Sequence, residues 1–212
     1  MKYYGSLEAG GTKMVCAIGD EQGNILERIS IPTLEPENTM PAIIDFFKNK
    51  NISALGIGCF GPVDLDRKSA TYGYITTTPK LPWKNYDIVG VCEKELGVPV
   101  GFDTEVNASA LGEATWGCTK DLSNSIYITV GTGIGVGVII DRKPYHGMLH
   151  PEGGGVSHQE QMLPMIRKEV ERQMGGYIQA KGMKDLDHYI VLPSLNDNQG
   201  IMGGLKLAMD AE

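Results

Sequence analysis

The sequence predicts an α/β protein built from two related lobes. A strand, a glycine-rich turn and a second strand follow one another around residue 10 and again around residue 131. Further apolar strand runs alternate with amphipathic helical stretches, the pattern typical of α/β proteins. The 212 residues suffice for one sizeable domain or two small ones.

The composition is that of a globular protein and argues against several functional classes. Hydrophobic residues make up 42% and charged residues 21%, whereas a disordered chain has fewer apolar residues. The net charge is −7 and no cluster of Lys and Arg occurs, so we expect no nucleic-acid partner. No apolar run approaches the ~20 residues of a membrane span. The first residues do not resemble a targeting peptide, so we expect a cytoplasmic protein without a membrane partner.

The first part of the chain carries strand and helix signals in a regular order. Three apolar runs separated by Gly, Asp/Asn and Pro turns predict a meander of strands. A buried strand then runs into Phe60-Gly61-Pro62, which predicts a tight loop. Predicted strands cover 3–9, 14–18, 25–31, 54–59 and 98–102, and predicted helices cover 40–49, 89–96 and 107–116.

The second part repeats the strand–turn–strand unit and then becomes helical. This repetition is the reason to expect two lobes. The four cysteines form no CxxC pair and have no histidine at metal spacing, so we expect reduced, buried thiols. Predicted strands cover 125–130, 136–140 and 187–192, and predicted helices cover 159–174 and 200–209.

Two glycine turns are candidate phosphate sites. In the first, EAGGTK (8–13), the glycines allow backbone N–H groups to approach a phosphate, and Thr12 and Lys13 add a hydroxyl and a charge. An ordinary hairpin turn would have the same residues, and the spacing is not that of a Walker A loop. The second turn, TVGTGIGVGV (129–138), has alternating glycines that weaken a strand, a cost that ligand approach can justify.

Together with further segments, these turns resemble the ROK family of sugar kinases, and the resemblance is closest to its bacterial fructokinases. It implies the actin-like ATPase (RNase H-like) fold with two lobes. The N-terminal lobe, 1–116, would hold the first phosphate loop and the sugar pocket. A truncated C-terminal lobe, 117–212, would hold the second phosphate loop. The further segments are GIGCFGPVD (56–64), YGYITTTPK (72–80), DTEVN (103–107), GMLHPE (147–152) and the tail at 187–193 and 200–203.

The resemblance implies ATP-dependent phosphorylation of a hexose, most of all fructose to fructose 6-phosphate, with ATP and Mg²⁺ as cofactors. Glu105 takes the place of the family's catalytic base, and Glu8 is the candidate that holds Mg²⁺ through water. The first phosphate loop is Gly10, Gly11, Thr12 and Lys13, the second is Gly131, Thr132, Gly133 and Gly135, and Gly154 and Gly155 belong to a turn near the adenosine. The sugar pocket is Gly61, Thr77, Thr104, Glu105 and Glu152.

Two of these roles have a plain structural alternative. The family has an aspartate at the position of Glu105, and the extra methylene moves the carboxylate roughly 1–1.5 Å, which can cost about 10²-fold in rate. A carboxylate in the first turn of a helix is also favoured by the helix dipole alone. Asp103 falls on the same side and either assists or caps the helix. Glu152 in a His-Pro-Glu stretch is also typical of a surface turn.

The chain lacks part of the C-terminal lobe that the resemblance leads us to expect. In the family a zinc loop with three cysteines follows the HPE stretch, but no cysteine lies beyond Cys118, so we expect no zinc. HPE is followed directly by GGGV, a gap of about 80 residues, the size of a small subdomain. The remaining sheet should then have an uncovered apolar face and a new edge. Four consequences or causes of this gap remain open: the lobe has repacked, a partner covers the exposed face, the chain is a poorly stable relative, or its reading frame is damaged.

Two other functions compete with that of a kinase. The internal deletion would also produce a weak or inactive relative that binds sugar or nucleotide without turnover. ROK repressors carry a helix-turn-helix before the kinase-like fold, and this acidic chain begins at the first strand, which argues against a regulator. The family is commonly dimeric, so a homodimer is the expected assembly, although the missing zinc region often supports it.

Overall fold

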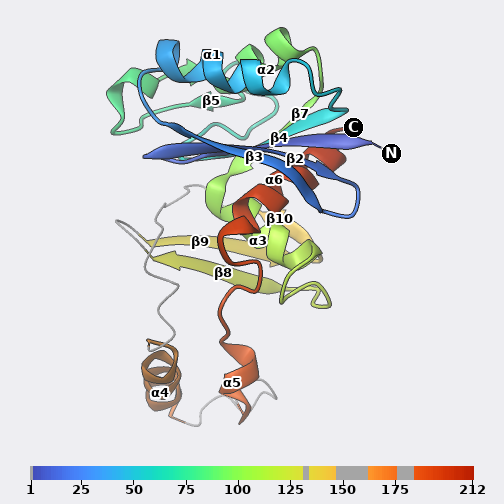
Figure 1. The fold of residues 1–212 in the computed structure, drawn as a ribbon. Coiled ribbons are helices and arrows are strands. Elements are labelled where there is room, and N and C mark those ends of the chain that lie inside the picture. Colours follow the sequence, from blue (N-terminus) through green and yellow to red (C-terminus); the bar gives the residue numbers. More distant parts are fainter. Residues whose placement is uncertain (1, 131–133, 147–161, 176–183) are drawn as a thin grey trace.

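The structure, a computed structural model, describes residues 2–130, 134–146, 162–175 and 184–212. Its elements form layers (Figure 1): two helices cover one face of a five-stranded sheet, two further helices lie under its other face, and a three-stranded sheet follows. Two sheets with helices packed between them confirm the predicted α/β architecture of two lobes.

The first sheet is mixed and has the strand order β3-β2-β1-β4-β7. The meander β1–β2–β3 pairs antiparallel, whereas β4 lies parallel to both β1 and β7. These strands match the predicted ones, except that β7 begins two residues later than expected. Their bounds are β1 Tyr3–Ala9, β2 Lys13–Asp20, β3 Ile25–Pro32, β4 Ala54–Cys59 and β7 Val100–Thr104.

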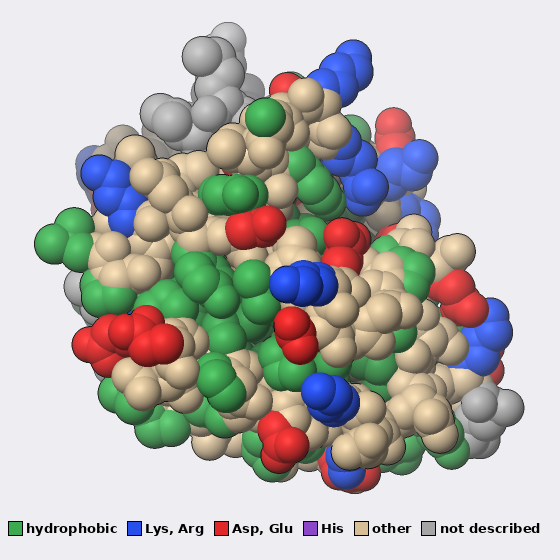
Figure 2. Space-filling model, turned by 90° about the horizontal axis from the view of Figure 1, so that it is seen from above, with side chains coloured by type: hydrophobic (Ala, Val, Ile, Leu, Met, Phe, Trp, Pro, Cys, Tyr) green, Lys and Arg blue, Asp and Glu red, His purple; other side chains and the backbone are tan. Residues whose placement is uncertain are grey.

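Helices α1 (Pro36–Phe47) and α2 (Ile88–Leu96) cover one face of this sheet. Helix α1 begins four residues before its predicted start, because Pro36 supplies the fixed φ angle that suits a first helical turn. Trp83 is fully buried in the core beneath these helices. Seen from this side, apolar side chains lie next to acidic ones (Figure 2). A groove of about 620 Å³ runs between α1 and α2. Its lining residues do not include those at the strand ends described below.

Helices α3 (Glu105–Thr115) and α6 (Gln199–Ala211) lie under the other face and pack closely against each other. Their contact depends on a glycine, because a Cβ on Gly203 of α6 would collide with the backbone of α3. The contact of α6 with the sheet does so too, because a Cβ on Gly56 of β4 would collide with the backbone of α6. Helix α6 therefore packs on β1, β4 and β7, although it belongs to the second half of the chain. The division at 116/117 remains a prediction.

The second sheet has the order β10-β9-β8 and is antiparallel. Gly137 and the buried Ile139 face α3, where a Cβ on Gly137 would lie 2.9 Å from that of Ala110. The opposite face is apolar and exposed, as expected for a lobe that lacks its outer helices. Its exposed side chains are Ile126, Ile128, Ile134, Val136 and Ile140. The strands are β8 Ser125–Val130, β9 Ile134–Ile140 and β10 Lys143–Tyr145.

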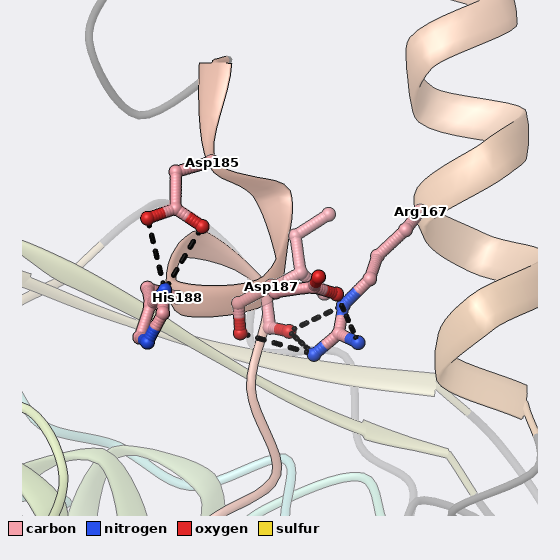
Figure 3. A network of polar contacts seen from close by, with 5 residues as sticks. Arg167, Asp185, Asp187 and His188 are labelled. Atoms are coloured by element: carbon pink, nitrogen blue, oxygen red, sulfur yellow. Dashed lines mark hydrogen bonds and ion pairs between the residues drawn. The ribbon is translucent and has the colours of Figure 1, made fainter.

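The strand predicted at 187–192 is wrong. This stretch instead contains the short helix α5 (Leu186–Tyr189), which lies beside α4 (Met162–Met174) (Figure 3). The Arg167 guanidinium of α4 donates to the carbonyls of Asp187 and Ile190 and pairs with the Asp187 carboxylate at 2.7 Å. These carbonyls are thereby satisfied by a side chain rather than by a neighbouring strand.

The remaining elements are short. A two-stranded sheet and two 3-10 turns were not predicted from the sequence, and one cysteine expectation fails: Cys16, Cys59 and Cys92 are buried, but Cys118 is exposed in the turn after α3. In the part of the chain that the structure describes, no helix is long and apolar enough to cross a membrane. The short elements are β5 Tyr74–Ile75, η1 Leu81–Trp83, β6 Tyr86–Asp87 and η3 Asn196–Asn198.

Candidate active site

The carboxyl ends of three neighbouring strands meet at one edge of the first sheet. The parallel register places Ala9 beside Cys59 and Cys59 beside Thr104. The glycine turn, the Gly61 loop and helix α3 follow these three residues directly. Because ligands of parallel sheets bind outside the carboxyl ends of the strands, this edge is the candidate site. Residues predicted from three distant segments are thereby brought together.

The glycine turn between β1 and β2 is closed and braced. Its Gly10 N–H donates to the Lys13 carbonyl at 3.1 Å. Thr33 holds the turn from outside, because its hydroxyl donates to the Gly10 carbonyl at 2.8 Å and its N–H to the Thr12 carbonyl at 3.0 Å. Within the described chain, the amides of Gly11 and Thr12 donate to no acceptor. Free amides on a fixed turn are what a phosphate oxygen needs.

Glu8 lies in β1 just before this turn and points toward α6. Strand alternation puts it on the same face as Ser6, whose hydroxyl donates to the Ile201 carbonyl of α6 at 2.7 Å. A Cβ on Gly200 would lie only 2.8 Å from the Glu8 carboxyl carbon, so the carboxyl packs against the first turn of α6. Burial raises the pKa of Glu8, and the nearby Arg28 and Lys13 partly oppose this. No described residue donates a hydrogen bond to the Glu8 carboxylate.

Glu105 is the first residue of α3. The Thr104 hydroxyl caps this helix by accepting the Asn107 N–H at 3.2 Å. Burial, with a smaller contribution from the Glu8 carboxylate, raises the pKa of Glu105 to about 7. Its carboxylate accepts no hydrogen bond from the residues that the structure describes. A carboxyl group with a pKa near neutrality suits a general base, which must both accept and release a proton at working pH.

Asp103 is buried and its carboxylate is committed to several partners. It accepts the Thr104 N–H at 2.7 Å and the Asn107 side-chain amide at 2.8 Å, so it supports the start of α3. His146, the residue after β10, contacts it through Nε2 at 2.7 Å, and this contact raises the pKa of His146. Of the two roles considered for Asp103, these bonds favour capping. They also connect the second sheet to the candidate site.

The predicted sugar-pocket residues occupy the same edge where the structure describes them. Gly61 is buried and precedes a cis bond to Pro62. The Pro62 carbonyl accepts both the N–H of Thr76, at 2.7 Å, and its hydroxyl, at 2.9 Å. This draws the loop of Thr77, which is exposed, toward Gly61. Thr104 is buried and caps the start of α3.

The second phosphate turn is described only in part. Gly135 is buried in β9 and pairs with Thr129 of β8. No group of three or more metal-binding side chains occurs in the ranges that the structure describes. The predicted residues Gly131, Thr132, Gly133, Glu152, Gly154 and Gly155 lie outside the described residues.

Two residues of this edge were not assigned a role from the sequence. His146 meets Asp103 across 43 positions of chain, and no sequence pattern signals such a pair. The stem of Lys80 lies over Gly11, with its Cε atom 3.4 Å from the place of a Cβ there. Its segment, TTTPK, is part of the family resemblance, which gives Lys80 no role of its own.

The profile of the ROK family matches residues 4–152. The chain belongs to the ROK family. The match ends at the HPE stretch, the point at which the segment expected in ROK kinases is missing from the sequence.

Relatives and solved structures agree with this assignment. The chain is 34% identical to a fructokinase of Pediococcus pentosaceus, over 98% of each chain. That alignment spans 284 residues, more than the 212 of this chain, so the relative has residues without a counterpart here. Identity to a fructokinase of Lactococcus lactis is 47% over 152 residues, 72% of this chain and 51% of the relative. A ROK glucokinase of Streptomyces griseus, solved with glucose and AMPPNP, matches at TM-score 0.66 and 19% identity, over 98% of this chain and 99% of that one.

Proposed function

We propose that the chain is an ATP-dependent hexose kinase and that fructose, converted to fructose 6-phosphate, is its substrate. One observation carries the proposal: a carboxyl group with a pKa of about 7, Glu105, shares a sheet edge with a braced glycine turn whose amides are free. A base and a phosphate cradle side by side are the two parts that phosphoryl transfer to a hydroxyl requires. The fructokinase relatives support the choice of sugar.

In the proposed reaction the chain positions both substrates and moves one proton. The amides of Gly11 and Thr12, together with the Lys13 ammonium, bind the terminal phosphate of ATP. The sugar lies over Gly61, Thr77 and Thr104. Its hydroxyl oxygen forms a bond to the γ-phosphorus while the bond to the β-phosphate oxygen breaks. Glu105 takes the hydroxyl proton, and ADP leaves.

Magnesium fits the acidic end of this site. Glu8 is a partly buried carboxyl group without a hydrogen-bond donor among the described residues, and the water shell of a hydrated cation would supply that donor. Mg²⁺ bound there with the phosphates would neutralise charge on their oxygens. The second phosphate turn, the adenosine turn at Gly154 and Gly155, and Glu152 at the sugar are further parts of the proposal. So are a lobe boundary at 116/117, a cytoplasmic location and a homodimer.

The exposed outer face of the second sheet favours a second candidate function. A lobe without its outer helices can retain ligand affinity and yet fail to close over ATP, which kinases need in order to exclude water. The chain would then bind sugar or nucleotide without turnover.

One experiment separates the two functions. Purified protein is melted alone and with MgATP plus fructose, and ADP release is measured in the same sample. A ligand that binds only the folded state stabilises it by about 2.7 kcal/mol at a hundredfold excess over Kd. Stabilisation together with fructose-dependent ADP release, abolished in Glu105→Gln, supports the kinase. Stabilisation without ADP release supports the binding protein, and release that persists in Glu105→Gln contradicts the proposed base.

A further inference from the structure

Lys80 lies beside the glycine turn but has no assigned role in the reaction described above. Its Cε atom would be 3.4 Å from a Cβ on Gly11, an ordinary contact distance, so the lysine stem lies directly against the turn. In the described part of the chain, the Lys80 ammonium forms no hydrogen bond and no ion pair. A cation is thus held next to free amides without an anion.

The backbone of Lys80 is fixed by hydrogen bonds to its neighbours. Its carbonyl accepts the N–H of Trp83 at 2.8 Å, and its own N–H donates to the hydroxyl of buried Thr78 at 3.2 Å. Trp83 is 1% exposed, and its indole N–H donates to the Leu34 carbonyl at 2.7 Å. A buried indole with a satisfied N–H is a rigid anchor for the lysine three residues before it.

The same anchor is tied to the glycine turn by two routes. Leu34, which accepts the Trp83 indole, follows Thr33, the residue that braces the turn. Phe60 packs edge-on against Trp83, with ring centroids 6.1 Å apart, and donates its N–H to the carbonyl of Ala9 at 2.8 Å. The turn and the Lys80 backbone are therefore parts of one braced unit, and the lysine side chain extends from it to the turn with the free amides.

The charges on the two sides of the turn are complementary to a phosphate. Trp83 belongs to the core on the α1–α2 face of the sheet, so Lys80 approaches the turn from that face. Lys13 leaves the turn on the opposite face, the one that Glu8 shares. From these positions we infer that Lys80 is a second phosphate-binding cation, which contacts the phosphoryl group during transfer from ATP to the sugar. This inference rests on the proposed kinase function.

The test compares three variants of the full chain. Lys80→Met keeps the stem and removes the charge, Lys80→Arg keeps the charge, and Lys84→Met removes a charge from an exposed lysine four residues away. The Kd for MgATP is measured by calorimetry, and kcat and KM with fructose are measured separately. We expect Lys80→Met to raise the Kd for MgATP and to lower kcat/KM for MgATP. The fall in kcat/KM should be about 10- to 100-fold, as expected for the loss of a charged hydrogen bond. Lys80→Arg should restore most of both, and Lys84→Met should change neither.

The outcomes distinguish this inference from the proposed function. If Lys80→Met matches the wild type, or if Lys84→Met loses as much, the inference is wrong and the kinase stands. If the wild type binds MgATP but transfers nothing to fructose, the kinase is wrong and the Kd values alone decide the role of Lys80. If the wild type does not bind MgATP, both are overturned. Equal melting temperatures of Lys80→Met and wild type show that the loss is not one of folding.

Discussion

The Glu105 carboxyl group should lower the stability of the fold as the pH rises, and Glu105→Gln should remove this loss of stability. Burial raises its pKa from 4.5 to about 7, so the fold disfavours the ionised carboxylate. The resulting loss in the free energy of unfolding is absent well below pH 4.5, where Glu105 is protonated in both states. It grows as Glu105 ionises in the unfolded chain, and it is constant well above pH 7. Glutamine has nearly the same shape and no charge, so Glu105→Gln removes this cost.

The two pKa values set the size of the effect. Linkage gives a gain for Glu105→Gln of about 1 kcal/mol at pH 5 and about 3 kcal/mol at pH 8. For a chain of this length, 3 kcal/mol corresponds to roughly 5–10 °C in melting temperature. The variant should therefore melt well above the wild type at pH 8 and only slightly above it at pH 5, although it has lost the carboxylate that we propose as the base.

The assay is urea unfolding at pH 5 and pH 8, without Mg²⁺ or nucleotide, for wild type, Glu105→Gln and the control Glu93→Gln. Glu93 is exposed in α2, so its replacement should give the same difference at both pH values. A stability difference between wild type and Glu105→Gln that does not grow by roughly 2 kcal/mol from pH 5 to pH 8 would refute the argument. The same pKa predicts that kcat/KM of the wild type rises with pH through a midpoint near 7.

Three further predictions follow from individual contacts. His146 should titrate above 6.5 by NMR and return toward that value in Asp103→Asn; because its pKa is raised, the ion pair is complete at low pH and is lost as the pH rises through the raised value. Gly203→Ala should cost about 3 kcal/mol in urea, because its Cβ meets the backbone of α3. Gly97→Ala, at φ +67° with open space around it, should cost about 1 kcal/mol, and equal costs would contradict the close helix contact. Ile128→Thr on the exposed sheet face should reduce fluorescence of a hydrophobic dye without lowering the melting temperature, and an unchanged signal would mean that this face is covered in solution.

Local signals predict the first sheet well and the tail poorly. Strands β1, β2 and β3 follow from apolar runs between Gly, Asp and Pro turns, because turn chemistry is local. The run Tyr-Ile-Val-Leu at 189–192 has the same β-forming residues, yet no strand pairs with it, and Arg167 of α4 takes the Ile190 carbonyl instead. Strand formation requires a neighbour, and the identity of the neighbour is not a local property.

The candidate site shows the same division. The register of three parallel strands brings the glycine turn, Gly61 and Glu105 to one edge, and each of these was marked in the sequence by its own segment. The pairs of residues that surround the carboxyl groups of the site have no such signal in the sequence. Glu8 meets Gly200 because α6 packs on the first sheet, and Asp103 meets His146 because β10 lies against α3. Both contacts join residues far apart in the chain.

The layer of α3 and α6 explains how a shortened second lobe can still carry an ordered sheet. Helix α3 contacts β4 and β7 on one side and β8 and β9 on the other, so it belongs to both lobes. The inner face of the second sheet, with Gly137 and Ile139, is buried by this helix, which also packs on the first sheet. Glu105 begins this same helix, so any tilt of the second sheet on α3 acts directly on the proposed base. Folding of the remaining lobe and the position of the Glu105 carboxylate therefore depend on one helix, and the ligand-dependent melting experiment tests both together.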